Sequence, residues 1–486
     1  MIEKLKELSK DTAIYGVSTM VGRFLNFLLV PFYTHVFSDF NYGIVTNLYI
    51  FIAIFNVIFI YGMDAAYLKY AAIPSEKDDK DNFSTPYLSV FVAGILLVLL
   101  IVALKKAIFV TFDIPFDHLK LIYLVVPILF IDAINVIPFI KLRIQRHAKK
   151  FATFKLLNIL VNVALNLYLI LKLKWGIEAV FVSNIAASGF TFILLFPDVL
   201  KYLRVKIRFD LLKKFLKFGI PYLPASLASI FVQGIDRPIL GHLTNLGTVG
   251  VYSANYKLGI FMMLFVSMFQ YAWQPFFLQN AEEKNAKELF SKVLTYFTIT
   301  ASFILVVISL FISDIVKLDI FGRTIIAKAY WGGLNIVPVI LFGYLFNGLY
   351  VIFTAGIFIK EKSIYIPFIT GLGAAVNIIV NFALIPSFGM MGAALATLAA
   401  YLAMALSLYF VTQKIYKIHY EYKKMFKVFS FILLIGVLYY SFLYSGHLLF
   451  VYKIILFVMF TLWMIFYVMD KDEMNFFKTK LLKIKK

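Results

Sequence analysis

Apolar segments of roughly twenty residues follow one another along almost the whole chain, and this pattern limits the fold more than any other feature. A helix of that length crosses the hydrocarbon core of a bilayer, which is about 30 Å thick. We place fourteen such spans near residues 12–33, 43–63, 86–104, 119–140, 152–171, 177–197, 218–238, 249–271, 291–313, 331–353, 364–385, 390–411, 427–444 and 449–469. The pattern predicts an all-α membrane protein with fourteen transmembrane helices.

The composition supports this interpretation. Of the 486 residues, 62% are hydrophobic and 15% are charged, whereas soluble domains average about 45–50% apolar and about 25% charged residues. The net charge of +21 could suggest nucleic acid, but the Lys and Arg residues are dispersed among short loops. They are therefore interpreted as topology signals and contacts to lipid headgroups, with no nucleic acid as a partner. The absence of cysteine excludes disulfides and thiolate metal sites.

The positive charges also predict the orientation. If the N-terminus is inside, the cytoplasmic segments hold roughly four times as many Lys and Arg residues as the opposite side. Both termini are then cytoplasmic. The longest loops, 198–217 and 272–291, are expected to form amphipathic helices along the membrane surface. The sequence contains neither a nucleotide-binding G-x-x-x-x-G-K-[ST] motif nor an H-E-x-x-H motif, so we expect a protein that is not an enzyme.

The chain contains an internal repeat. A Pro, a His and a Gly recur with identical spacing, as Pro31, His35 and Gly43 and again as Pro238, His242 and Gly250. Six spans separate the matched elements, so the two halves have the same orientation, as in transporters whose halves enclose a central cavity and work by alternating access. We expect two parallel six-helix lobes, 1–200 and 201–413, followed by two further helices and a basic cytoplasmic tail in 414–486.

Charged residues inside the predicted spans are the first candidates for function, because an unpaired charge in the bilayer is costly. Asp236, Arg237 and Lys257 lie in the stretch QGIDRPILGHLTNLGTVGVYSANYK. The alternative is that Asp236 pairs with Arg237 or Lys257 and only fixes two helices together. Arg237, at the outer edge of its span, could also extend toward the headgroups.

Three more charges lie in or at the ends of spans. Arg23 is in the middle of an apolar run, and it either holds an anionic substrate or pairs with Asp132 or Asp64. Asp132, deep in the fourth span, is a candidate for coupling transport to an ion gradient, because an intramembrane carboxylate can take up and release a proton. Asp64 is expected to pair with Lys69 in a structural role.

Asparagines form two polar stripes. Asn158, Asn162 and Asn166 recur every four residues in the fifth span, and Asn377 and Asn381 repeat part of this pattern in the eleventh. The stripes either line the path of a polar substrate or form hydrogen bonds across a helix interface.

Two stretches carry a resemblance to a known family. NIIVNFALIPSFGMMGAALATLAAYL (377–402) resembles the C-terminal signature of bacterial polysaccharide flippases, and IDRPILGHLTNLGTVGVYSANYKLG (235–259) resembles their seventh–eighth span region. The family is the Wzx-like branch of the multidrug/oligosaccharidyl-lipid/polysaccharide superfamily. The resemblance implies twelve core helices in two lobes plus two more. It also implies movement of an undecaprenyl-diphosphate-linked oligosaccharide across the bacterial cytoplasmic membrane, for O-antigen, capsule or exopolysaccharide assembly.

The resemblance also suggests roles for the cations. Related lipid II flippases carry a functional Arg in the first helix, matched here by Arg23, and another in the eighth, where this chain has Lys257. With Arg237, these side chains would hold the diphosphate, and the Asn stripes would face the sugar. A second Arg of the first helix is missing, because Leu28, Leu29 and Val30 stand there. We therefore favour an oligosaccharide-lipid over lipid II. A proton or sodium gradient would drive the cycle without a cofactor or metal.

Other functions remain open. A cation-coupled multidrug exporter of the same superfamily would share the lobes, although such exporters usually have twelve spans and acidic cavities. A polysaccharide polymerase or ligase would typically need a large extracytoplasmic loop, and the longest outer segments here are short. The expected partners are the lipid-linked oligosaccharide, membrane lipids, and the polymerase and glycosyltransferases of the same pathway.

Overall fold

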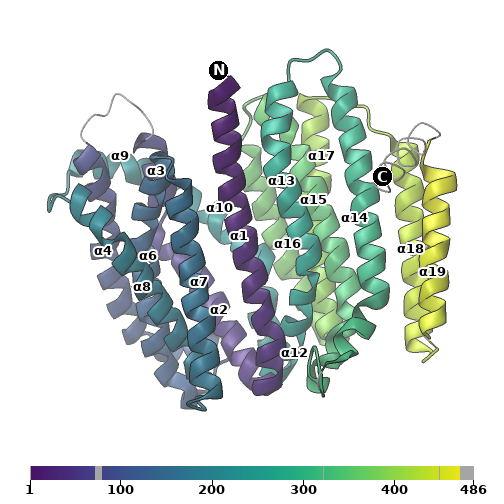
Figure 1. Ribbon diagram of the computed structural model, residues 1–486, viewed down its shortest axis with the longest axis horizontal. Helices are drawn as coiled ribbons and strands as arrows, with labels where there is room; N and C mark the ends of the chain where they lie inside the picture. Colours follow the sequence, from purple (N-terminus) through teal and green to yellow (C-terminus); the bar gives the residue numbers. More distant parts are fainter. Residues whose placement is uncertain (1, 72–78, 321, 448, 471–486) are drawn as a thin grey trace, which may run out of the picture. The chain divides into compact units, whose positions relative to one another are not determined.

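The computed structural model describes residues 2–71, 79–320, 322–447 and 449–470. This part of the chain is almost entirely helical (Figure 1). Contacts between residues divide it into two compact units. Unit 1 comprises Met1–Ile260, Ile326–Ile336 and Ile364–Met404, and unit 2 comprises Phe261–Ile325, Val337–Ser363 and Ala405–Lys486. These units are defined by contacts between residues and do not coincide with the two halves of the sequence repeat. The predicted lobe boundaries at residues 200 and 413 therefore stay a prediction.

Unit 1 holds most of the chain. Its helices are α1 (Ile2–Val36), α2 (Asp39–Ile60), α3 (Met63–Ala71), α4 (Asp79–Ala103), α5 (Lys105–Thr111), η1 (Phe116–Leu121), α6 (Ile122–Ile144), α7 (Ala148–Leu171), α8 (Glu178–Tyr202), α9 (Phe209–Gly219), α10 (Tyr222–Gly234), α11 (Asp236–Leu243), α12 (Leu246–Tyr256), η2 (Lys257–Gly259), η3 (Lys328–Ile336), α16 (Tyr365–Phe388) and the first part of α17 (Met390–Ile415). Within it, α2 packs on α12, α10 on α16, and α7 on both α1 and α8.

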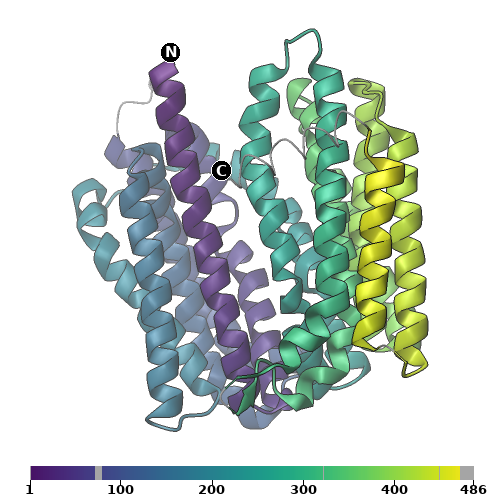
Figure 2. The same cartoon turned by 45° about the vertical axis from the view of Figure 1, so that its right-hand side comes forward.

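Unit 2 contains α13 (Ile260–Asn280), α14 (Ala286–Lys317), α15 (Val337–Ile359), the end of α17, α18 (Tyr422–Tyr444), α19 (Phe450–Trp463) and a π-helical turn, η4 (Met464–Val468). A short hairpin pairs β1 (Asp319–Ile320) antiparallel with β2 (Arg323–Thr324). α18 and α19 lie side by side (Figures 1 and 2), with the Phe431 and Trp463 rings stacked at 4.6 Å. The Lys453 ammonium of α19 reaches the Asp314 carboxylate of α14 at 2.6 Å.

The number of spans differs from the predicted fourteen. Twelve helices of the described chain are long and apolar enough to cross a membrane, or up to thirteen if α9 and α10, which are bent by 42°, form one span. The difference lies in α1 and in α9–α10, where Gly219 and Pro221 interrupt the helix. The protein is a multi-pass membrane protein, and the sidedness of its termini stays a prediction.

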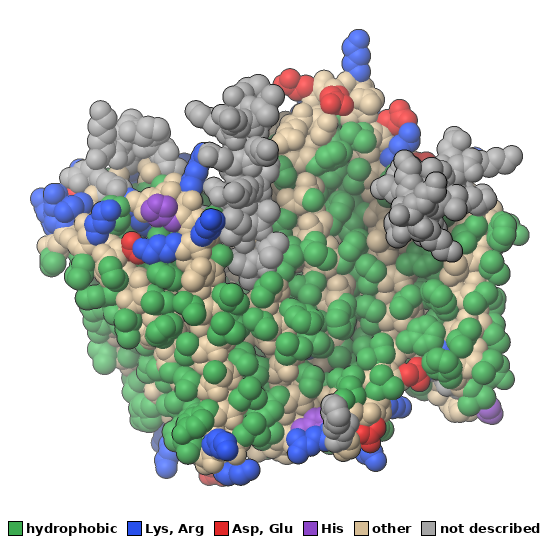
Figure 3. Space-filling model, viewed as in Figure 1, with side chains coloured by type: hydrophobic (Ala, Val, Ile, Leu, Met, Phe, Trp, Pro, Cys, Tyr) green, Lys and Arg blue, Asp and Glu red, His purple; other side chains and the backbone are tan. Residues whose placement is uncertain are grey.

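The exposed surface matches a bilayer environment. Hydrophobic side chains cover the middle of the helices, whereas Lys and Arg side chains gather near the helix ends (Figure 3). The prediction of a surface helix over 272–291 is wrong, because α13 continues to Asn280 and α14 begins at Ala286. In 198–217, α8 extends to Tyr202 and α9 forms the amphipathic helix.

The repeat is visible in matched helix caps. The Ser38 hydroxyl accepts a hydrogen bond from the Asn41 amide at 3.2 Å at the start of α2. At the matched position before α12, the Asn245 side chain accepts from the Thr248 amide at 2.8 Å. Ser and Asn are favoured at this position because their oxygens satisfy an otherwise unpaired backbone N–H.

The matched glycines of the repeat meet each other. α2 crosses α12 where Gly43 lies against the Leu246 carbonyl and Gly250 lies against the Asp39 carbonyl. A Cβ atom at either glycine would overlap the opposing backbone oxygen. Small residues allow this closeness of approach between membrane helices, so Gly at both positions fixes how the two halves of the repeat pack within unit 1.

Candidate functional site

A pocket of about 460 Å³ lies in unit 1 between helices from both halves of the repeat. Its polar and charged lining consists of Asn26, Tyr33, Tyr42, Thr46, Tyr49, Asn158, Asn162, Asn184, Gln233, Arg237 and Lys257. No lining residue in the described chain carries a carboxylate. The pocket therefore combines two cations with uncharged hydrogen-bonding groups, an arrangement that suits an anion attached to a polar group.

Arg237 is held firmly at the pocket wall. Its Nη1 donates to the Asp236 carboxylate at 2.9 Å and to the Gln233 carbonyl at 2.7 Å. Its guanidinium lies over the Tyr256 ring, 4.2 Å from the ring centre. The side chain is only 8% exposed, so it does not extend toward the headgroups. The predicted pairing of Asp236 with Arg237 is confirmed. Although it is paired, Arg237 lines the pocket.

Asp236 lies behind Arg237 and does not line the pocket. Its carboxylate is 1% exposed and also accepts hydrogen bonds from the Tyr252 hydroxyl and, at 3.4 Å, from the Thr397 hydroxyl. All four residues belong to unit 1. The alternative prediction, that Asp236 pairs with Lys257, is wrong, because the Asp236 carboxylate contacts Arg237 and two hydroxyls instead.

Lys257 faces the pocket directly. It lies in the turn after α12, and its ammonium donates to the Tyr42 hydroxyl of α2 at 3.0 Å. A tyrosine hydroxyl does not neutralise an ammonium, so Lys257 supplies positive charge to the pocket. Together with Arg237, it places two cations on the wall formed by the second half of the repeat.

Asp132 belongs to a second polar cluster. The Ser188 hydroxyl donates to its carboxylate at 2.6 Å, and the charge that acts on it is that of Lys155. The Lys155 ammonium lies 4.3 Å from the centre of the Phe139 ring. The predicted pairing of Arg23 with Asp132 is therefore not what the structure shows. Lys155 was missed because it was counted among the loop cations, although it lies inside α7.

Arg23 and Asp64 lie apart from the pocket lining. Arg23 is exposed on α1, three positions before the pocket residue Asn26. Asp64 is exposed in the first turn of α3, while the Lys69 ammonium lies 3.9 Å from the centre of the Phe218 ring. The described contacts contain no ion pair between Asp64 and Lys69, so that expectation is wrong.

The asparagine stripes separate into two roles. Asn162 lines the pocket, whereas Asn166 is fully buried and accepts a hydrogen bond from the Tyr33 hydroxyl at 2.8 Å. Asn377 and Asn381 are also fully buried, and the Asn381 amide donates to the Asn377 carbonyl at 2.8 Å. These contacts favour helix packing for Asn166, Asn377 and Asn381. Asn158 lines the pocket together with Asn162 and donates to the Thr191 hydroxyl at 2.9 Å. A place on the substrate path for Asn162 stays a prediction.

Several pocket residues were not found by sequence reasoning. Asn26 and Gln233 lie at matched positions of the repeat, each five residues before a matched proline, and both line the pocket. The repeat therefore held the signal that could have identified them. Tyr49 and Asn184 carried no such signal, because tyrosine and single asparagines are common throughout this chain.

Comparison with solved structures shows the fold. One similar structure is that of "Lipid II flippase MurJ, inward closed conformation", with a TM-score of 0.75, 16% identity, and coverage of 94% of this chain and 99% of that one. An inward-facing multidrug resistance MATE family transporter of the MOP superfamily has a TM-score of 0.66 and 11% identity, with 83% of this chain and 97% of that one covered. The Vibrio cholerae MATE transporter VcmN in the bent form has a TM-score of 0.51 and 12% identity, with 84% of this chain and 97% of that one covered. These identities support a shared fold alone.

Sequence comparison shows the family. No curated protein matches this sequence. A profile of the family described as "Polysaccharide biosynthesis protein" matches residues 36–323, which is more than half of the chain. The resemblance noted in the sequence is thereby confirmed, and the chain belongs to the polysaccharide biosynthesis protein family.

Proposed function

We propose that this protein is a flippase that moves an undecaprenyl-diphosphate-linked oligosaccharide from the inner to the outer leaflet of the bacterial cytoplasmic membrane. The moved oligosaccharide would serve surface polysaccharide assembly, with the polymerase and glycosyltransferases of that pathway as partners. The observation that carries the proposal is the pocket in which Arg237 and Lys257 stand among uncharged polar side chains. Family membership supplies the link to polysaccharides.

The pocket chemistry fits the part of this substrate that resists crossing a bilayer. A lipid diphosphate carries about two negative charges. The Lys257 ammonium can balance part of this charge, and the Arg237 guanidinium, whose own charge is paired with Asp236, can donate further hydrogen bonds to the phosphate oxygens. Lys257 offers an ammonium whose only described hydrogen bond goes to a neutral hydroxyl, that of Tyr42, and Arg237 offers a guanidinium whose orientation is fixed by Asp236 and Tyr256. The volume of about 460 Å³ accommodates a diphosphate and the adjoining sugar, with the prenyl chain left in the lipid.

Movement would follow alternating access, as in transporters built from parallel repeats. A proton or sodium gradient is the proposed energy source. Of the predicted coupling carboxylates, Asp132 is the better candidate, because Asp236 is already neutralised by Arg237. Asp132 contacts a neutral Ser188 hydroxyl and interacts with Lys155, a pair whose charge balance an incoming proton or sodium ion would alter.

The test is the fate of the lipid-linked sugar when the protein is removed. Cells without the protein should lose one surface polysaccharide and accumulate undecaprenyl-diphosphate oligosaccharide on the cytoplasmic leaflet. Wild-type protein should restore export, Lys257→Gln should not, and Lys149→Gln, which changes an exposed lysine outside the pocket, should behave as wild type. Unchanged surface glycan in the deletion would overturn the proposal.

A lipid II flippase is the second candidate, supported by the likeness to the MurJ structure. Both substrates carry a diphosphate, so the pocket cations fit either one. Reconstituted protein supplied separately with lipid II and with a lipid-linked oligosaccharide would distinguish them by which substrate reaches the outer leaflet. A cationic drug is a poorer fit, because the described pocket lining is cationic and has no carboxylate.

A further inference from the structure

The amphipathic helix α9 is fixed to the rest of unit 1 along one face. Phe215 is fully buried, and its ring stacks on that of Tyr70 in α3 at 5.6 Å between centres. The Lys214 ammonium lies 4.3 Å from the centre of the same Tyr70 ring. Gly219, at the end of α9, meets Gly62 backbone to backbone, so neither position has room for a side chain. This face of α9 is an interior contact.

The opposite face of α9 is open. It forms a groove of about 590 Å³ whose lining includes Phe209, Leu212, Leu216 and Ile220 together with Lys213 and Lys217. These residues recur at helical spacing on one side. Phe209 is 77% exposed and Ile220 is 52% exposed. Large apolar side chains grouped on an open face mark a surface that something else covers.

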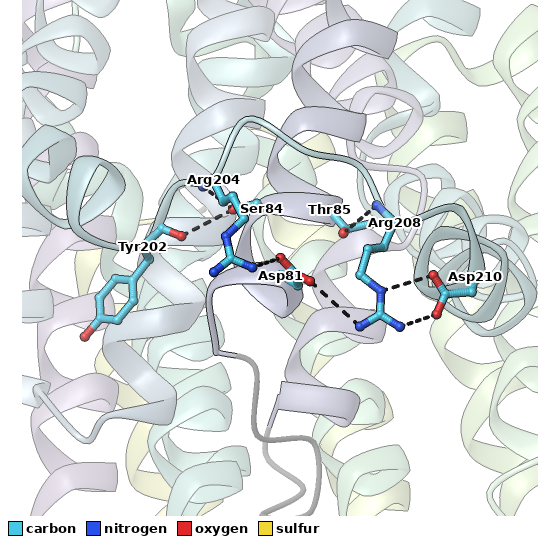
Figure 4. A network of polar contacts seen from close by, with 7 residues as sticks. All are labelled: Asp81, Ser84, Thr85, Tyr202, Arg204, Arg208 and Asp210. Carbon is cyan, nitrogen blue, oxygen red and sulfur yellow. Dashed lines mark hydrogen bonds and ion pairs between the residues drawn. The ribbon is translucent and has the colours of Figure 1, made fainter.

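The segment that leads into α9 is fastened in place (Figure 4). The Asp81 carboxylate, at the start of α4, lies 3.0 Å from an Arg204 guanidinium nitrogen and 3.8 Å from one of Arg208. The backbone amides of the same two arginines donate to the Ser84 and Thr85 hydroxyls at 2.7 and 3.3 Å. The side chains and backbone amides of both arginines therefore attach the linker to α4. These contacts fix the position of the N-terminal end of α9 within unit 1.

We propose that this open face docks on anionic phospholipid of the cytoplasmic leaflet. Lys213 and Lys217 would contact headgroup phosphates, while Phe209, Leu216 and Ile220 enter the boundary between headgroups and acyl chains. Basic residues among apolar ones on a single helix face are the complement of such lipids. The inference rests on the membrane orientation given by the positive charges, and it does not depend on which sugar the protein carries.

The location of α9 favours lipid over a protein partner. α9 passes through Ile220 and Pro221 directly into α10, and the seventh span predicted from the sequence begins at residue 218. With that span in the bilayer, the C-terminal end of α9 lies at the membrane surface. α10 ends at Gly234, and α11, which carries the pocket residue Arg237, begins at Asp236. Lipid held on α9 would therefore influence the position of Arg237 through α10.

Lipid binding by the full-length protein tests the proposal. Purified protein in neutral detergent is given phosphatidylglycerol or phosphatidylcholine with the same acyl chains, and bound lipid is counted by native mass spectrometry. We expect a preference for phosphatidylglycerol that weakens about thirtyfold in Lys213→Gln/Lys217→Gln, since each lysine near the headgroups is worth about fivefold in affinity. Lys206→Gln, an exposed linker lysine outside the groove, should bind as wild type.

Two results of that experiment would overturn the proposal. One is a double variant that keeps the preference of the wild type. The other is equally tight binding of glycerol phosphate, which has the anionic headgroup without chains and would show that the groove takes only a free anion. Circular dichroism and thermal unfolding of each variant confirm that the helix is intact, which is expected because the changed lysines are exposed.

The absence of cysteine provides a second measurement. Phe209→Cys and Lys206→Cys each introduce a single thiol, whose reaction with a membrane-impermeant maleimide is followed in lipid nanodiscs. The thiol of Phe209→Cys should react at least tenfold more slowly in phosphatidylglycerol nanodiscs than in detergent, because it lies below the headgroups. The thiol of Lys206→Cys should react equally in both. Equal rates for Phe209→Cys, or protection that appears only in whole cells and thus reports a protein partner, would contradict lipid docking.

Discussion

Removing one member of the Asp236–Arg237 pair should destabilise the protein far more than removing both. The Arg237 nitrogen lies 2.9 Å from the carboxylate, and the two side chains are 8% and 1% exposed. At that distance and an effective dielectric constant of about 20, the attraction is about 6 kcal/mol, which is offset by several kcal/mol of desolvation for each ion. Loss of one partner from a buried pair typically costs about 3–5 kcal/mol.

The structure places Arg237→Gln near the lower end of that range. The Tyr252 and Thr397 hydroxyls still donate to the orphaned Asp236 carboxylate, so we expect a loss of about 3 kcal/mol. In the double variant Asp236→Asn/Arg237→Gln, two neutral amides replace two charges. We expect most of the loss to be recovered there, with a coupling free energy of at least about 3 kcal/mol.

A double-mutant cycle on full-length protein in detergent, followed by denaturant unfolding, measures this coupling. The matched control is the pair formed by Lys292 and Glu288, whose nitrogen and oxygen are also 2.9 Å apart but whose side chains are exposed; its cycle should show no measurable coupling. Additive effects at Asp236 and Arg237, within about 0.5 kcal/mol, would refute the buried-pair reasoning. Flipping is the separate readout: if Arg237 holds the diphosphate, the double variant regains stability without regaining export.

Three further perturbations test other parts of the structure. Lys257→Gln should reduce flipping in reconstituted vesicles while changing the unfolding free energy by less than about 1 kcal/mol, because a glutamine can still contact the neighbouring hydroxyl; a large stability loss would instead assign it a structural role. Gly250→Ala should cost about 1–3 kcal/mol of unfolding free energy, since its Cβ overlaps the facing backbone carbonyl, and Gly436→Ala, at an open position, is the control. Asn166→Ala should cost about 1–3 kcal/mol by leaving the buried Tyr33 hydroxyl unpaired, and a matching loss in Tyr33→Phe/Asn166→Ala would contradict this account.

The transmembrane helices were the most predictable part of the fold, because their formation depends on local hydropathy and length. Most predicted spans coincide with a single helix, because a segment in hydrocarbon must satisfy its backbone groups internally and is recognisable by its length and hydropathy. The exceptions are informative. Gly219 and Pro221 separate α9 from α10, so 218–238 is not one continuous helix. Most of 272–291 belongs to two long helices, because α13 continues through Pro275 to Asn280 and α14 begins at Ala286.

The candidate site was predicted less completely. Intramembrane charge identified Asp236, Arg237 and Lys257, since the cost of such charges does not depend on the details of packing. Lys155 was missed because the boundary between loop and helix decides whether a lysine counts as a topology signal. Asn166, Asn377 and Asn381 followed the same four-residue pattern as Asn162, and periodicity does not tell which face of a helix meets a pocket.

The sequence by itself determined that the chain crosses a membrane many times, that it contains a repeat, and which charges lie within the apolar spans. These properties depend on hydropathy and spacing, which are local along the chain. Only the tertiary structure decided that Asp236 pairs with Arg237 and leaves Lys257 to Tyr42, and that Gly43 and Gly250 face each other. Whether Asp236 meets its neighbour Arg237 or the more distant Lys257 depends on the directions of the side chains, and those directions are set when the helices pack.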